Sequence, residues 1–146
     1  MSRILGLDIG DKTVGVAVSD PLFISAQGVT TIERIGIKKD TTKVVDLIRE
    51  YEVERVVCGL PLMLDGSDSP QTGKVREFVE RLQNKARSMG FAKVEFAFQD
   101  ERFTTKIAEN VLIEGGMRRE KRKEIIDRQA AIIILQSYMD AHAQGR

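Results

Sequence analysis

The chain of 146 residues carries 23 Lys and Arg against 22 Asp and Glu, a formal charge of +1, so its overall charge does not mark it as a partner of polyanions. Its composition, 42% hydrophobic and 31% charged, is that of a globular domain and excludes an intrinsically disordered chain. With one cysteine, Cys58, and one histidine, His142, the sequence excludes an internal disulfide and a cysteine- or histidine-rich metal site, so we expect any catalysis to use carboxylates.

The first part of the chain predicts an antiparallel sheet. Residues 3–9 and 13–19 are rich in aliphatic and β-branched side chains and are separated by a short turn, as in a β-hairpin. Residues 24–32 follow a second turn and predict a third strand. We therefore expect the first three strands to be antiparallel.

The middle of the chain predicts alternating helices and strands. Apolar residues at helical spacing indicate a helix over 38–51, and the short apolar segment 55–60 indicates a strand. Residues 61–70, which contain two prolines and a glycine, are expected to form a loop. A helix over about 72–89 and a strand over 94–98 follow. The order strand, helix, strand implies a parallel crossover.

Two further helices, over about 104–114 and 121–142, complete the chain. The predicted fold class is α/β, with a mixed five-stranded sheet, its first three strands antiparallel, and helices on both faces. No boundary indicates a second domain, so residues 1–146 are expected to form one. The longest apolar run, 130–135, is far shorter than the roughly 20 residues that span a bilayer, and we expect a soluble cytoplasmic protein with no membrane partner.

Asp8 is the one acidic residue in the otherwise apolar segment 4–9. A buried carboxylate needs a hydrogen-bond partner, a proton or a cation, because leaving it unpaired costs several kcal/mol. Two interpretations are open at this point. Asp8 either binds a metal ion or accepts hydrogen bonds from the turn at Gly10.

Asp127 shares one face of the last predicted helix with three apolar residues, Ala130, Ala131 and Ile134. This face is expected to be buried. The two alanines would let the helix approach the sheet closely and bring Asp127 toward the strand ends. The alternative is that Asp127 caps a helix that starts near Arg128.

Asp100, Glu101 and Arg102 directly follow the last predicted strand, at the sheet edge where parallel strands place their ligands. A solvated turn is the alternative. If Asp8, Glu101 and Asp127 converge, they repel one another unless a cation neutralises them. Oxygen ligands without histidine or thiolate favour Mg²⁺ or Mn²⁺. Two such cations can activate water and stabilise the leaving oxygen of a phosphodiester, which predicts a metal-dependent nuclease.

These acids belong to an ordered set of motifs that resembles the YqgF family, also called RuvX. The resemblance covers nearly the whole chain. Its motifs are Gly6-Leu7-Asp8-Ile9-Gly10, Gly15-Val16-Ala17-Val18-Ser19-Asp20, Gly59-Leu60-Pro61, Asp65-Gly66, Asp100-Glu101-Arg102, Thr104-Thr105, and Asp127 with Ala130-Ala131. Met63 departs from the polar residue that the family often has at its position.

The resemblance implies a ribonuclease-H-like fold with metal-binding acids at Asp8, Glu101 and Asp127. It also implies a bacterial cytoplasmic hydrolase that matures the 5′ end of pre-16S rRNA. Because the family is also described as Holliday-junction-resolvase-like, a resolvase acting on four-way DNA is the alternative. The expected partner is nucleic acid, either pre-ribosomal RNA or branched DNA, and the chain is expected to act as a monomer or a homodimer.

Other residues near these acids are candidates for phosphate binding. A basic cluster ahead of the last helix either holds nucleic acid or is a solvated helix entrance: Arg118, Arg119, Lys121, Arg122 and Lys123. Lys12 and Arg102 are candidates for direct phosphate contact, with surface ion pairs as the alternative, and Asp100 is a candidate for supporting a neighbouring metal ligand. Thr104 and Thr105 either bind phosphate or cap the helix that they open.

Two other classes of protein fit part of the sequence. A strand, an aspartate, a glycine turn and a second strand also occur in actin-like and sugar-kinase-like ATP-binding proteins, but those proteins normally need two such domains. A non-catalytic RNA-binding, ribosome-associated factor is the other class, but it has no need of acids that repel phosphate. A titration with ATP and a metal-dependent cleavage assay would separate both classes from a nuclease.

Overall fold

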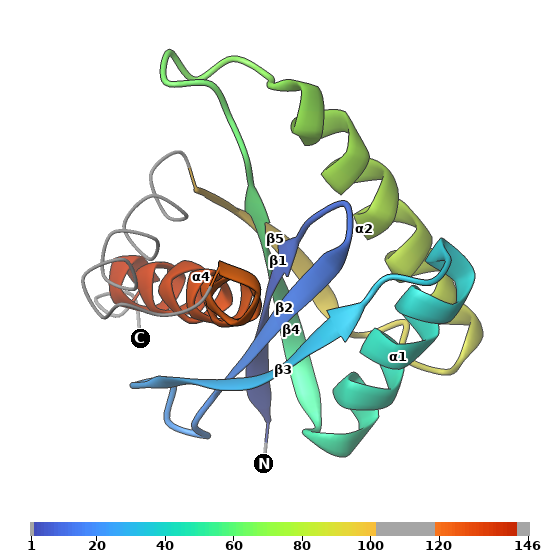
Figure 1. Ribbon diagram of the computed structural model, residues 1–146. Helices are drawn as coiled ribbons and strands as arrows, with labels where there is room; N and C mark the ends of the chain where they lie inside the picture. The colour runs from blue at the N-terminus through green and yellow to red at the C-terminus, as the bar shows by residue number, and fades with distance from the viewer. Residues whose placement is uncertain (1, 102–118, 143–146) are drawn as a thin grey trace.

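The computed structural model describes residues 2–101 and 119–142, and the side chains of residues 2–101 and 128–142. The elements along this part of the chain are β1 (Arg3–Ile9), β2 (Thr13–Ser19), β3 (Ala26–Glu33), α1 (Ile37–Glu50), β4 (Val53–Leu60), α2 (Pro70–Ser88), β5 (Glu95–Asp100) and α4 (Arg119–His142). The strands lie in one sheet, and the helices pack against it (Figure 1).

Strand β1 lies at the centre of a five-stranded sheet of order β3-β2-β1-β4-β5. The pairs β1–β2 and β2–β3 are antiparallel, whereas β1–β4 and β4–β5 are parallel. The last pair is parallel because α2 carries the chain back along the sheet between the two strands. The predicted mixed sheet with three antiparallel strands at its start is confirmed.

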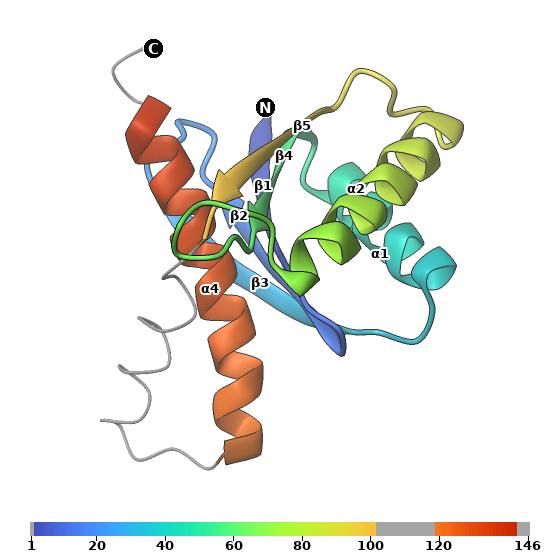
Figure 2. The same ribbon diagram turned by 90° about the horizontal axis from the view of Figure 1, so that it is seen from above.

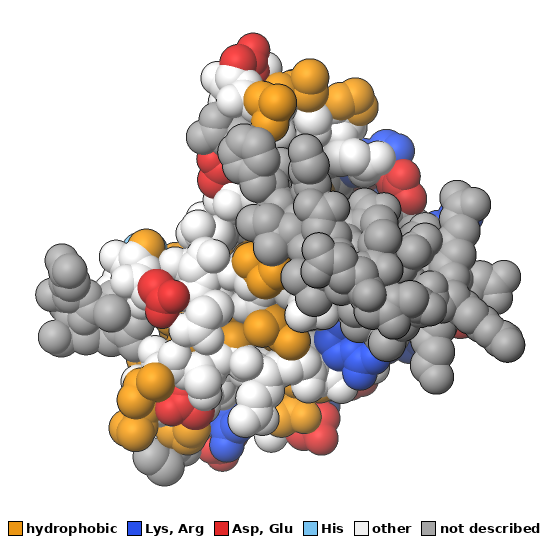
Figure 3. All heavy atoms as spheres, turned by 60° about the vertical axis from the view of Figure 1, so that its left-hand side comes forward, with side chains coloured by type: hydrophobic (Ala, Val, Ile, Leu, Met, Phe, Trp, Pro, Cys, Tyr) orange, Lys and Arg blue, Asp and Glu red, His pale blue; other side chains and the backbone are white. Residues whose placement is uncertain are grey.

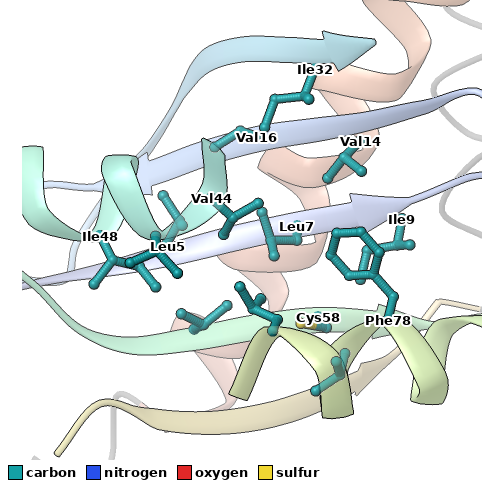
Figure 4. Close-up of a cluster of buried hydrophobic side chains, with 14 of the residues drawn as sticks. Leu5, Leu7, Ile9, Val14, Val16, Ile32, Val44, Ile48, Cys58 and Phe78 are labelled. Carbon is teal, nitrogen blue, oxygen red and sulfur yellow. The ribbon is translucent and has the colours of Figure 1, made fainter. Parts of the chain in front are cut away.

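The helices form two layers, with α1 and α2 on one face of the sheet and α4 on the other (Figures 1 and 2). Alternate residues of each strand supply the two layers. In β1, Leu5 and Leu7 belong to the core beneath α1 and α2 (Figure 4), whereas Ile4 packs with residues of α4. Cys58 is fully buried in the first core, where burial raises the pKa of its thiol. The helices therefore cover both faces, as expected.

Helix α4 approaches the sheet closely because Gly6 has no side chain. A Cβ atom on Gly6 would lie 2.7 Å from Cβ of Leu135 and 3.1 Å from the carbonyl oxygen of Ala131. Ala130 and Ala131 are both completely buried. The small residues of the predicted helix face thus lie against the sheet, as their spacing indicated.

The ends of some elements differ from the predicted ones because side chains bind the backbone there. Strand β3 begins at Ala26 rather than residue 24, since the carboxylate of Asp20 accepts hydrogen bonds from the backbone N–H groups of Leu22, Ile24 and Ser25. Helix α2 begins at Pro70 rather than 72, because Ser69 caps it. The side chains of Ser69 and Thr72 complete a capping box.

The last two predicted helices have different outcomes. Helix α4 begins at Arg119, two residues before the predicted start. The predicted helix 104–114 lies outside the described residues. Among the described helices, none combines the length and the apolar character needed to span a bilayer.

Candidate active site

The carboxylates of Asp8 and Glu101 lie on the α4 face of the sheet. Ile4 packs with α4 and Gly6 faces Leu135, so the alternation of β1 assigns Asp8 to the same face. Glu101 directly follows β5, and its backbone N–H donates to the carbonyl oxygen of Leu60 at 3.2 Å. Two acids separated by 93 positions in the numbering are thus brought to one end of the sheet.

Strand β4 lies between these two acids and has a glycine at the critical position. Leu7 pairs with Cys58, which puts Gly59 beside Asp8 in the parallel register. A Cβ atom on Gly59 would lie 2.6 Å from Oε2 of Glu101. The absence of a side chain at Gly59 therefore leaves the space in which the carboxylate of Glu101 lies.

Glu101 is 8% exposed, and its Oε2 atom has no hydrogen-bond partner among the described residues. The pKa of Glu101 is raised to about 9, mainly by burial and in addition by the charge of Asp8, a side-chain hydrogen bond with Asp8 and the charge of Asp100. Without a cation, Glu101 therefore holds a proton at neutral pH and shares a hydrogen bond with Asp8.

This carboxylate pair fits a divalent cation. A buried acidic oxygen without a partner is costly, and a cation would offset the repulsion between the two acids. The donors are hard oxygens, the ligand type that Mg²⁺ and Mn²⁺ prefer. Among the described side chains there is no group of three or more potential metal ligands.

Asp127 belongs to α4, with its side chain outside the described set. It lies eight residues after the helix begins at Arg119, so the alternative that it caps a helix starting near Arg128 is wrong. The sequence suggested this alternative because aspartate is a preferred N-cap residue. The position of Asp127 relative to the two other acids remains a prediction.

Asp100 and Glu101 are neighbours in sequence but occupy alternate positions. Asp100 is in register with Leu60 at the end of β5, and the alternation of β5 groups it with Phe96, which packs toward α1 and α2. Its charge nevertheless raises the pKa of Glu101. A supporting role for Asp100 stays a prediction.

The other predicted site residues are only partly covered by the structure. Lys12 is exposed in the β1–β2 turn, where its carbonyl oxygen accepts a hydrogen bond from the N–H of Arg34. Arg102, Thr104, Thr105 and Arg118 lie outside the described residues. The remaining members of the basic cluster begin α4, with side chains that are likewise not described: Arg119, Lys121, Arg122 and Lys123.

A buried ion pair that the sequence did not reveal supports the turn after Asp8. Arg34 donates from Nε to Asp40 at 3.2 Å and from Nη1 to the carbonyl oxygen of Gly10 at 2.9 Å. Asp40 is completely buried and also accepts from the N–H of Ile35 at 3.0 Å. An acid on the first turn of an amphipathic helix was the available signal, but it did not indicate the arginine as its partner.

Comparison with known proteins identifies the family of this chain. A family model described as "RuvX: Holliday junction resolvase" matches residues 2–141. The chain belongs to the RuvX family. Relatives in this family from Clostridium tetani (47% identical) and Caldanaerobacter subterraneus (49% identical) are provisionally named pre-16S rRNA nucleases, and each alignment covers 95% of this chain and 96% of the relative. RuvX membership makes this chain a nuclease, and therefore a hydrolase.

Solved structures support the fold of this RuvX chain. RuvC of T. thermophilus, in complex with a Holliday junction substrate, matches with a TM-score of 0.60 and 14% identity over 98% of this chain and 96% of that chain. The yeast mitochondrial Holliday junction resolvase Ydc2 matches with a TM-score of 0.58 and 13% identity over 98% and 80%. At such identities the likeness concerns the fold, and it confirms the predicted ribonuclease-H-like class.

The loop between β4 and α2 projects from the same end of the sheet. It leaves β4 at Leu60, whose carbonyl oxygen binds the N–H of Glu101. Hydrophobic side chains gather on this loop at the top of Figure 3, and Met63 and Leu64 are 49% and 69% exposed. Met63, the residue that departs from the polar one expected for the family, therefore lies at the surface.

Proposed function

We propose that this chain is a divalent-metal-dependent endonuclease of the cytoplasm that acts on pre-16S rRNA as a single domain over residues 1–146. Asp8, Glu101 and Asp127 would hold Mg²⁺ or Mn²⁺. The observation that carries this proposal is the buried, unpartnered Oε2 atom of Glu101 beside Asp8. A carboxylate pair of this kind is costly to a protein that does not use it.

The two described acids would do different work. Glu101 lies between β4 and α4, and its burial keeps water away from the carboxylate and would hold it in one place. Asp8 is half-buried, so its carboxylate would remain accessible to a phosphodiester. Bound divalent cations supply activation of water and stabilisation of the leaving oxygen in such a site.

The course of α4 supports Asp127 as the third ligand. Tyr138 accepts a hydrogen bond from Arg55 near the start of β4, whereas Ile134 lies against Gly59 near its end. Moving toward the helix N-terminus thus moves along β4 toward the acids. Asp127 lies about two turns beyond Ile134 in this direction.

The names of the relatives favour RNA as the substrate. Those quoted above are named for pre-16S rRNA, whereas the family model is named for the Holliday junction. Cleavage of four-way DNA is therefore the second candidate activity. The basic cluster at the start of α4, with Lys12, Arg102, Thr104 and Thr105, would bind phosphates of either substrate, and the chain would act as a monomer or a homodimer.

The test compares cleavage of a pre-16S rRNA 5′ precursor with cleavage of a four-way DNA junction, each with Mg²⁺, with Mn²⁺ and with a chelator. We expect RNA cleavage that requires a cation and is abolished by Glu101→Gln. The matched control is Glu80→Gln, which removes the same charge from an exposed position on α2 and should retain activity. Cleavage in the chelator, or full activity of Glu101→Gln, would contradict the proposal. Tight RNA binding without any cleavage would favour a non-catalytic factor.

A further inference from the structure

A polar groove of about 310 Å³ lies between the outer strands and the N-terminal half of α4. It is lined by Thr13, Val29, Thr30, Thr31, Glu33 and Arg128. Thr13 comes from β2 and Arg128 from α4, and the other residues come from β3. The groove thus opens on the α4 side, the side of the sheet that carries the two acids.

The sheet register connects this groove to the acids. Asp8 pairs with Gly15, and Gly15 pairs with Thr31, so the three residues form one row across β1, β2 and β3. Adjacent strands are about 4.8 Å apart, so Asp8 and Thr31 are separated by roughly 10 Å. Gly15 itself is buried, so the row fixes the distance between Asp8 and the groove and does not form an open channel between them.

Arg128 is fixed at the side of this groove by its hydrocarbon stem. A Cβ atom on Gly28 would lie 2.9 Å from both Cγ and Cδ of Arg128, which shows that the stem lies directly on β3. Packing of the stem reduces the freedom of the side chain before any ligand binds.

The guanidinium of Arg128 is unpaired within the described part of the chain, where it has neither an ion pair nor a hydrogen bond. Other partly buried arginines differ in this respect. Arg34 is paired with Asp40, and Arg55 is paired with Glu95. A positioned guanidinium without a counter-charge, in a polar groove, is suited to bind an anion such as a phosphate.

We propose that Arg128 forms a phosphate subsite that holds a phosphodiester of the substrate strand next to the one at Asp8 and Glu101. The proposal rests on the proposed nuclease function and adds to it a second phosphate contact, on the β3 side of the two acids. Glu33 also lines the groove, and its negative charge would repel a phosphate and so favour the Arg128 side.

The test uses Arg128→Met, which keeps the stem on Gly28 and removes the charge, with Arg81→Met as the control. Arg81 is exposed on α2, on the opposite face of the sheet. Binding of a single-stranded RNA oligonucleotide to the full chain is measured in a chelator over a range of salt concentrations. We expect Arg128→Met to weaken binding about tenfold at low salt and to reduce the slope of log K against log salt by about 0.7, the value for one phosphate contact. Arg128→Lys should restore the slope and part of the affinity.

A second measurement locates the contact. Oligonucleotides with one uncharged methylphosphonate at successive positions remove one phosphate charge at a time. A methylphosphonate at one position should weaken binding to the wild type but not to Arg128→Met, because the contact between Arg128 and that phosphate is already lost in the variant. The inference would be overturned if Arg128→Met and Arg81→Met weakened binding equally. It would also be overturned if no methylphosphonate position affected the wild type more than Arg128→Met. These binding measurements do not depend on cleavage, so loss of the subsite and failure of the proposed nuclease function give different results.

Discussion

Gly59 and Glu101 are matched in space: a Cβ atom on Gly59 would lie 2.6 Å from Oε2 and 2.8 Å from Cδ of Glu101. The same atom would lie 2.4 Å from Cδ1 of Ile134 on α4. The carboxylate of Glu101 is thus confined between a strand and a helix, and the glycine of β4 makes the room for it.

Gly59→Ala should therefore damage the site more than its small size suggests. The new methyl group must displace Glu101 or Ile134, and both side chains are buried against Gly59. We expect the cleavage rate to fall tenfold or more, because displacing a catalytic group by about 1 Å costs about that much or more, and the free energy of unfolding to fall by about 1–3 kcal/mol. Single-turnover cleavage and urea denaturation measure the two effects.

The control is Gly73→Ala in α2, where a Cβ atom meets nothing within 4 Å. This variant should leave cleavage intact and raise the free energy of unfolding by about 0.5–1 kcal/mol. Identical behaviour of the two variants would contradict this prediction.

The raised pKa of Glu101 predicts how the stability of the metal-free protein depends on pH. Folding raises this pKa from 4.5 to about 9, so the folded state keeps a proton that the unfolded state has lost. The stabilising contribution is complete below pH 4.5 and is lost as pH rises through 9. Glu101→Gln, which is neutral throughout, should gain stability relative to the wild type from pH 5 to pH 9. Urea denaturation in a chelator measures the difference, and a difference that does not change with pH would show that Glu101 is not buried as a carboxylic acid.

Cation binding should depend on pH for the same reason. A divalent cation must displace the proton that Glu101 holds, so the apparent affinity for Mn²⁺ should rise between pH 6 and pH 9 and binding should release a proton. Calorimetric titration in buffers of different ionisation enthalpy measures both quantities. Glu80→Gln serves as the control and should behave as the wild type. An affinity that stays constant over this range would rule out Glu101 as a ligand.

Asp127→Asn tests the third proposed ligand. The change keeps the size of the side chain and removes its charge, so cleavage should fall by orders of magnitude if Asp127 holds a cation. Because α4 begins at Arg119, no helix cap is lost, and the melting temperature in a chelator should be unchanged or higher. Cleavage assays and thermal denaturation check the two expectations. Full metal-dependent cleavage by the variant would remove Asp127 from the site.

Arg34→Met tests the ion pair that supports the turn after Asp8. The variant leaves the completely buried carboxylate of Asp40 without its cation, and we expect a loss of about 2–4 kcal/mol in the free energy of unfolding. Adding Asp40→Asn should recover part of this loss, because the uncompensated charge is then absent. Chemical denaturation of the single and double variants measures the coupling. A loss below about 0.5 kcal/mol for Arg34→Met would show that the pair acts as an ordinary surface ion pair.

Local patterns in the sequence determined most of the elements and some of the site. The apolar segments on both sides of the turn at 10–12 predicted the hairpin β1–β2, and the helical spacing of apolar residues predicted α1, α2 and most of α4. The sequence also showed Asp8 as an acid inside an apolar strand, because a strand can be recognised from the pattern of neighbouring residues. The two alanines after Asp127 indicated the close approach of α4.

Only the tertiary structure decided which distant residues meet. Asp100 and Glu101 are equivalent in sequence, but strand alternation and the bond to Leu60 direct Glu101 to the α4 face. The register of β1 with β4 brings Gly59 beside Asp8, and the packing of α4 encloses Glu101 next to it. Sequence periodicity reports the local path of the chain, whereas burial, and with it the pKa of Glu101, depends on the atoms that other segments place around a side chain.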